Sequence, residues 1–300
     1  MDNHGNQPKV YPNDPADAPR LLKIATTASV TTAMLLIGVK IVAWLLTGSI
    51  SVLASLIDSI MDAAASTLNL LAVRLSLQPP DREHRFGHGK VEPLAALVQA
   101  AFIVGSGLFL VLQAIDRLLH PRLLEDVSIG LLVMAFAIAA TIVLLLIQNH
   151  VIKRTGSTVI RADSLHYMTD VLTNLGTIAA LVLTQFGWPL FDPLFGIVIA
   201  VYICYGAWRI GVDAVNHLLD RELPDAVREQ VKQIVRDEPG ARGMHDLRTR
   251  QSGLIQIIQL HIELDAGLSL HDAHEISERV EEEIRRTFPL ADVTIHQDPV

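Results

Sequence analysis

ISVLASLIDSIMDAAASTLNLLAV, residues Ile50–Val73, is an apolar stretch long enough to cross a membrane, and Val159–Gln185 is a second one. Each carries an ionisable pair in its interior: Asp58 and Asp62 in the first, His166 and Asp170 in the second. Ionisable groups at bilayer depth are costly unless they meet a partner, a cation or a water-filled cavity. Three carboxylates and one imidazole form a donor set that suits divalent transition metals. The pattern therefore predicts a metal site inside a membrane domain.

The composition supports a membrane domain. Half of the 300 residues are hydrophobic and the mean hydropathy is +0.38, which is too apolar for an ordinary soluble protein of this length. Six segments are each long enough for the ~30 Å hydrocarbon core of a bilayer: Ile24–Thr47, Ile50–Val73, Pro93–Leu118, Ile129–Ile152, Thr158–Phe186 and Leu190–Trp208. We therefore expect an all-α, six-helix transmembrane domain over residues 21–211. No cleavable signal peptide is expected, because a polar tail, residues 1–20, precedes the first long segment.

Charge divides the chain into two parts. Up to Gly211 there are 14 acidic and 14 basic residues, whereas from Val212 onward there are 18 acidic and 10 basic ones. This change predicts a neutral membrane domain followed by an acidic soluble domain over residues 212–300. An acidic domain fits a partner that handles cations, and it argues against nucleic acid as a partner.

Basic residues set the expected orientation. Eleven Lys and Arg residues fall on one side of the six segments, and only Arg117 and Arg122 fall on the other. By the positive-inside rule, both termini are expected to be cytoplasmic. Lys40 lies near the outer end of the first segment, and we expect its side chain to snorkel toward the outer interface.

The two ionisable pairs are expected to meet at one depth. Members of each pair are spaced i, i+4 and share a helix face. The two segments run in opposite directions at ~1.5 Å per residue, which brings Asp58 level with Asp170 and Asp62 level with His166. Four donors at one level would complete a tetrahedral site. The alternative is two buried pairs neutralised by protons or hydrogen bonds, in which case protons and metal would compete for the same groups.

A second candidate site lies in the connection after the second segment. Asp81, His84 and His88 have residue types that bind metals, but Gly87 and Gly89 favour a loop, so the spacing alone is a weak metal signal against an ordinary solvated loop.

The last ninety or so residues predict the order helix, strand, strand, helix, strand. Asp225–Arg236 is the first expected helix, and apolar residues alternate with polar ones over residues 258–264. This order predicts a small α+β domain of ferredoxin-like type. His261 falls on the polar face of its strand, and His296 and Asp298 share a face of the last strand. The pattern leaves metal binding and solvent exposure equally open for these residues.

Four sequence motifs, in order, resemble those of the cation diffusion facilitators, and in particular their bacterial zinc and ferrous-iron efflux branch. They are LIDSIMD at residues 56–62, DREHRFGHGK at 81–90, ADSLHYMTD at 162–170, and the C-terminal pair HDLRTRQSG at 245–253 and IHQDP at 295–299. The resemblance covers nearly all of the chain after Leu21. It implies a homodimeric, proton-coupled antiporter of the bacterial inner membrane, with a metallochaperone-like cytosolic domain. The exported cation would be Zn²⁺, with Cd²⁺ and Fe²⁺ also accepted.

The resemblance also implies roles for individual residues. Asp58, Asp62, His166 and Asp170 would form the transport site, and Asp81, His84 and His88 would bind a metal in the loop. Lys90 would form a charge interlock with Asp220. A cytosolic two-metal Zn²⁺ site at the dimer interface would use His245, His261, His274, His296 and Asp298, with Gln297 nearby.

Other classes of protein fit the sequence less well. A membrane-anchored metal sensor without transport is the main alternative, but an anchor has no use for matched acids at the midplane. ATP-driven pumps are not expected, because no Gly-x-x-x-x-Gly-Lys-Ser/Thr run is present. We expect no enzymatic activity and no organic cofactor. The expected partners are a second copy of the chain, metal ions, protons and membrane lipid.

Overall fold

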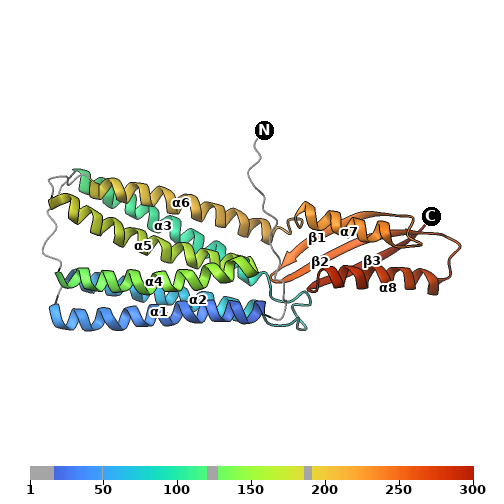
Figure 1. Cartoon of the computed structure of the whole chain (residues 1–300), viewed down its shortest axis with the longest axis horizontal. Helices are drawn as coiled ribbons and strands as arrows, with labels where there is room; N and C mark the ends of the chain where they lie inside the picture. Colours follow the sequence, from blue (N-terminus) through green and yellow to red (C-terminus); the bar gives the residue numbers. More distant parts are fainter. Residues whose placement is uncertain (1–16, 49, 120–127, 186–190) are drawn as a thin grey trace.

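The computed structural model describes residues 17–48, 50–119, 128–185 and 191–300. Residues 1–16 of the tail, which include His4, lie outside the described residues. So do residues 120–127, which include His120 and Arg122. Six long helices form the N-terminal part and run side by side, with the C-terminal domain at one end (Figure 1). They are α1 (Ala18–Thr47), α2 (Ile50–Ser76), α3 (Val91–Leu119), α4 (Ser128–Thr155), α5 (Thr158–Gln185) and α6 (Phe191–Leu218). The predicted helical membrane domain is confirmed, and α6 continues past the expected boundary at Gly211.

Within the described residues, five of these helices are long and apolar enough to cross a membrane, judged by length and composition. Helix α5 is equally long, at 28 residues, but it carries Arg161, Asp163 and Asp170 besides His166. Charged side chains within a membrane-spanning bundle mark their helices as functional, which here applies to α5 as well as to α2 with Asp58 and Asp62.

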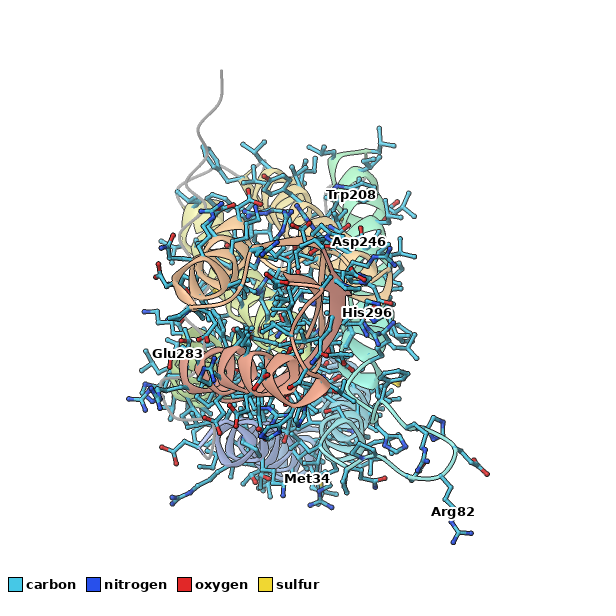
Figure 2. The ribbon with its side chains drawn as sticks, turned by 90° about the vertical axis from the view of Figure 1, so that its right-hand side faces the viewer. Met34, Arg82, Trp208, Asp246, Glu283 and His296 are labelled. Atoms are coloured by element: carbon cyan, nitrogen blue, oxygen red, sulfur yellow. The ribbon has the colours of Figure 1, made fainter. Side chains whose placement is uncertain are left out.

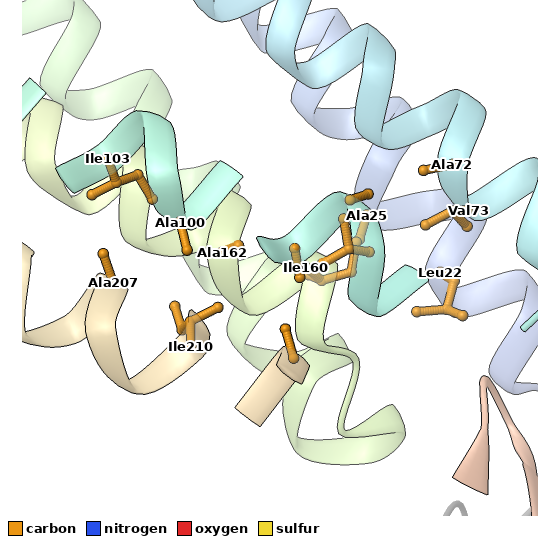
Figure 3. Packing of buried hydrophobic residues seen from close by; sticks show 14 of the residues in the cluster. Leu22, Ala25, Ala72, Val73, Ala100, Ile103, Ile160, Ala162, Ala207 and Ile210 are labelled. Atoms are coloured by element: carbon orange, nitrogen blue, oxygen red, sulfur yellow. The ribbon is translucent and has the colours of Figure 1, made fainter. Parts of the chain in front are cut away.

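Small residues let the helices approach closely. Alanines fill much of the core between them, including Ala25, Ala100, Ala162 and Ala207 (Figure 3). A Cβ added at Gly107 of α3 would lie 2.5 Å from the Sγ of Cys204 on α6, so a side chain there would push the two helices apart.

The C-terminal domain has the predicted order of elements: α7 (Asp225–Asp237), β1 (Gly243–Ser252), β2 (Ile255–Leu264), α8 (Leu270–Thr287) and β3 (Ala291–Pro299). Strand β1 pairs with β2 in antiparallel fashion, and β3 pairs with the other edge of β2 in parallel. Helices α7 and α8 contact each other as well as the sheet. Val231, Ile262 and Ile284 are fully buried between these layers. The α+β prediction is confirmed.

Candidate metal sites

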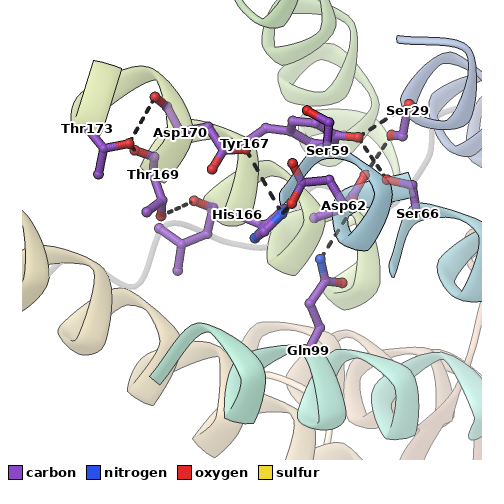
Figure 4. Close-up of polar contacts among 12 residues, drawn as sticks. Ser29, Ser59, Asp62, Ser66, Gln99, His166, Tyr167, Thr169, Asp170 and Thr173 are labelled. Atoms are coloured by element: carbon purple, nitrogen blue, oxygen red, sulfur yellow. Dashed lines mark hydrogen bonds and ion pairs between the residues drawn. The ribbon is translucent and has the colours of Figure 1, made fainter. Parts of the chain in front are cut away.

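Helices α2 and α5 bring three of the four predicted membrane ligands together. The Nε2 atom of His166 lies 2.9 Å from Oδ1 of Asp62 and 4.0 Å from Oδ2 of Asp170. One donor atom from each of the three residues lies within 4.8 Å of the other two, and all three side chains are partly buried (Figure 4). One imidazole and two carboxylates in this arrangement can hold a divalent cation and leave a coordination position open.

Asp58 does not join this group of three. Its side chain is exposed, one helical turn from Asp62 toward the start of α2. The i, i+4 spacing places Asp58 and Asp62 on the same face of α2. For both side chains to reach one metal site, α5 would also have to lie equally close to both turns of α2.

Lys40 contradicts the expectation that it snorkels outward. Its Nζ atom donates to the hydroxyl oxygen of Ser59, 2.6 Å away, and to the carbonyl oxygen of Ser55, 2.9 Å away. Both acceptors belong to α2, so the ammonium group points toward the helix that carries the candidate ligands. The expectation was wrong because these acceptors lie within reach of the lysine side chain.

Asp163 is a buried carboxylate to which the sequence reasoning gave no role. Oδ2 accepts from Ser29 at 2.6 Å and from Gln148 at 2.7 Å, while Oδ1 accepts from Asn69 at 3.0 Å and from Gln99 at 3.4 Å. These residues come from α1, α4, α2 and α3, so one carboxylate on α5 links five helices. The rule that singled out His166 and Asp170, an ionisable residue at bilayer depth, could have found it.

The loop residues after α2 also cluster. Asp81 Oδ1 lies 3.3 Å from Nδ1 of His84, and Oδ2 lies 3.4 Å from Nε2 of His88. Backbone N–H groups of His84 and Glu83 donate to Asp81 at 2.6 and 2.9 Å and hold the pKa of its carboxyl below the ordinary value. The His88 side chain is 9% exposed, and its Nδ1 atom has no hydrogen-bond partner among the described residues.

The sheet of the C-terminal domain holds a third cluster, centred on Asp298. Its carboxylate lies 3.1 Å from His245, 2.8 Å from His261 and 3.2 Å from His296. The hydrogen bond with His261 is the largest reason that the pKa of Asp298 is lowered. Figure 2 shows this end of the molecule, with His296 on the sheet and the loop of Arg82 extending away from the body.

Two residues near this cluster depart from the expected ligand set. Glu263 joins it, 3.1 Å from Nδ1 of His245. The sequence held a signal for Glu263, because it follows His261 by two residues and so lies on the same strand face. His274 is exposed on α8 and lies outside the group formed by His245, His261 and Asp298.

The expected pair of Lys90 and Asp220 is present at the joint between the domains. Lys90 Nζ lies 3.0 Å from Asp220, which also accepts from Arg250 at 3.2 Å. Partial burial opposes ionisation of Asp220, but hydrogen bonds from these two cations hold its pKa below the ordinary value of 3.8.

Comparisons with known proteins agree over most of the chain. Residues 26–219 match the family model of the cation efflux transmembrane domain, and residues 223–300 match that of the cation efflux protein cytoplasmic domain. The chain is 50% identical over 280 residues to the cation-efflux pump FieF of Salmonella arizonae, with 93% of each chain covered. FieF proteins of Citrobacter koseri and Klebsiella pneumoniae are 49% identical, again with 93% of each chain covered.

Among solved structures, MamM-CTD 215-293 is 23% identical, and the match covers 25% of this chain and 98% of that one with a TM-score of 0.24. The two family models leave little of the chain unmatched, and the relatives are half identical over nearly their full length. The chain therefore belongs to the cation diffusion facilitator family of membrane cation-efflux transporters.

Proposed function

We propose that this multi-pass membrane protein is a proton-coupled antiporter that exports Zn²⁺, and also Cd²⁺ and Fe²⁺, from the cytoplasm. The observation that carries the proposal is the meeting of Asp62, His166 and Asp170 between α2 and α5. A group of this kind inside an apolar bundle needs a cation or protons to be stable. In this proposal Asp58 completes the site when α2 and α5 close on the ion.

Competition between metal and protons supports the coupling. His166 coordinates a metal only as the neutral imidazole, and Asp62 and Asp170 coordinate only as carboxylates. Metal entering from the cytoplasm therefore displaces protons, and protons entering from an acidic outer face displace metal. Rocking of one part of the bundle against the rest would change which side the site faces. In this proposal the protein lies in a bacterial inner membrane, and both of its termini are in the cytoplasm.

The other two clusters serve stability and regulation in this proposal. The loop cluster of Asp81, His84 and His88 binds one Zn²⁺. The sheet cluster of His245, His261, His296 and Asp298 binds Zn²⁺ at the interface of a homodimer, and His274 contributes there. The unpartnered Nδ1 of His88 and the carboxylate shared among three histidines support these roles.

Metal flux into inside-out proteoliposomes with an imposed pH gradient tests the proposal. We expect gradient-dependent uptake of Zn²⁺ by the wild-type chain and its loss, by at least about a hundredfold, in Asp62→Ala, because one of a small set of ligands is removed. A parallel assay with Cd²⁺, Fe²⁺ and Mn²⁺ ranks the cations.

The matched control is Asp292→Ala, which removes an exposed carboxylate from β3. A wild-type rate of Zn²⁺ flux in the Asp62→Ala variant would show that Asp62, His166 and Asp170 do not form the transport site. Metal binding by a folded wild-type protein without any flux would favour a membrane-anchored sensor instead.

A further inference from the structure

Lys40 is a cation placed inside the bundle beside the proposed transport site. Its side chain crosses from α1 to α2 and ends on Ser59 and the carbonyl of Ser55. Ser59 itself is 1% exposed, so the ammonium group is anchored in the protein and not at the outer interface. An amine held at this depth needs negative charge nearby to remain an ion.

That negative charge comes from the proposed ligands. Asp58 and Asp62 flank Ser59 in α2. Asp170 of α5 lies at the same place, because Nε2 of His166 is 2.9 Å from Asp62 and 4.0 Å from Asp170. Both helices contact α1. Because Ser59 follows Asp58 directly and precedes Asp62 by three residues, the amine is tied to the turn of α2 between the two aspartates.

The sum of the charges at the metal-loaded site indicates a function for the amine of Lys40. Three ionised aspartates carry three negative charges, and a divalent cation with neutral His166 supplies two positive ones. The ammonium group of Lys40 supplies the third, so the metal-loaded site is electroneutral without an added proton. Low-dielectric surroundings penalise any net charge that remains, which makes this balance energetically important.

We infer that Lys40 is the built-in counter-cation of the transport site, which balances the metal-loaded carboxylates and limits how tightly they hold the metal. The inference rests on the proposed function. Lys40 does not contact the ligand atoms, so it is a positioning residue that acts through the electrostatic field of the site. It weakens metal binding by repulsion and thereby favours release.

The test compares Zn²⁺ flux, as KM and maximal rate, among variants of Lys40 in the full chain in proteoliposomes. Lys40→Gln removes the positive charge but keeps N–H groups that can donate to Ser59. Lys40→Met removes both the charge and the N–H donors. In these neutral variants we expect KM to fall at least about tenfold, because one unit charge no longer repels a divalent ion. The maximal rate should fall as well, because release becomes slower.

Two further variants separate charge from packing. Lys40→Arg keeps the charge and should keep KM within about threefold of wild type. Ser59→Ala removes the anchor but not the charge, so its KM should stay nearer to wild type than that of Lys40→Gln.

Each contrary outcome has a defined meaning. An unchanged or raised KM in Lys40→Gln overturns the inference, and so does a Ser59→Ala variant that reproduces the KM of Lys40→Gln. If Lys40→Met is not recovered folded, Lys40→Gln decides. Asp62→Ala is measured alongside: wild-type flux there overturns the proposed site itself, whereas loss of flux there with an unaffected Lys40→Gln overturns only the role of Lys40.

Discussion

Asp163 shows how one buried acidic side chain can organise a bundle. Its two oxygens accept from one hydroxyl and three amide groups, contributed by four other helices. The three amide groups can only donate through their N–H atoms, so both oxygens of Asp163 serve as acceptors. Each hydrogen bond of this kind contributes about 0.5–1.5 kcal/mol. The residue therefore stabilises the scaffold beside the proposed site without being a ligand.

Asp163→Asn should destabilise the protein. The new amide would place an N–H group against existing donors, and at least one of them would lose its acceptor. We expect the melting temperature of the purified full chain in detergent to fall by at least about 5 °C. Ser29→Ala, which removes a single donor, should cause a smaller drop, and the exposed Asp292→Asn should cause none. A stability ranking in which Asp163→Asn equals Asp292→Asn would contradict this account of the network.

At the scale of the elements, periodicity predicted the secondary structure well. The alternation around Ile258 and Ile262 gave β2, and long apolar runs gave the six helices, because both signals arise within a single element. The depth argument likewise brought Asp62 level with His166, since helix rise is nearly constant.

What the sequence did not predict depends on contacts between elements. The direction of Lys40 was set by acceptors on α2, and the partners of Asp163 come from four other helices. The exposed position of Asp58 depends on how closely α2 and α5 approach at each turn. Packing of this kind has no period in the sequence.

The sheet cluster allows a prediction about β2. His261→Ala removes the histidine closest to Asp298, so Zn²⁺ binding by the C-terminal domain should weaken by at least about tenfold. Flux at saturating Zn²⁺ should change much less, since the membrane group lies on other helices. Equilibrium binding by the full chain in the Asp62→Ala background measures the first effect without a contribution from the proposed transport site.

His271→Ala is the matched control for this measurement, because His271 is exposed on α8 and pairs with Glu275. Equal Zn²⁺ affinities of the His261→Ala and His271→Ala variants would show that the sheet cluster is a set of solvated side chains.

At the scale of the whole molecule, the loop between α2 and α3 of the membrane domain also contacts the C-terminal domain. The guanidinium carbon of Arg250 lies over the ring of Phe86, 5.0 Å from the ring centroid. Arg250 and Lys90 both form ion pairs with Asp220. The loop that holds the Asp81 cluster thus contacts the sheet directly. Metal in the loop and movement of the C-terminal domain are therefore expected to influence each other.

The joint should withstand mild acidification. The pKa of Asp220 is lower in the folded protein than its ordinary value of 3.8, so its ion pairs contribute stability above that pH and lose it as the pH falls through the folded pKa. Limited proteolysis between α6 and α7 should be unchanged from pH 8 to 5 and should accelerate below about pH 4. Asp220→Asn should be cleaved faster at pH 7 as well. Faster cleavage of the wild-type chain already at pH 6 would point to a different titrating group.

Close backbone contact at the joint gives a prediction for Gly89. A Cβ at this position would collide with the carbonyl carbon of Ser252, and backbone cannot rotate away as a side chain can. Overpacking of this kind costs about 1–3 kcal/mol, which lowers the population of the joined arrangement about fivefold or more.

Gly89→Ala should therefore increase proteolysis between α6 and α7 and slow Zn²⁺ flux, while Zn²⁺ binding by the sheet cluster stays at the wild-type level because no strand is altered. Gly38→Ala is the matched control, since a Cβ there meets no atom within 4 Å among the described residues. If Gly89→Ala keeps both the protease resistance and the flux of the wild-type chain, contact between the loop and the β1–β2 turn does not join the two domains in the working transporter. If flux falls while protease resistance is kept, the loop acts on the membrane helices directly, through α3, and not through the C-terminal domain.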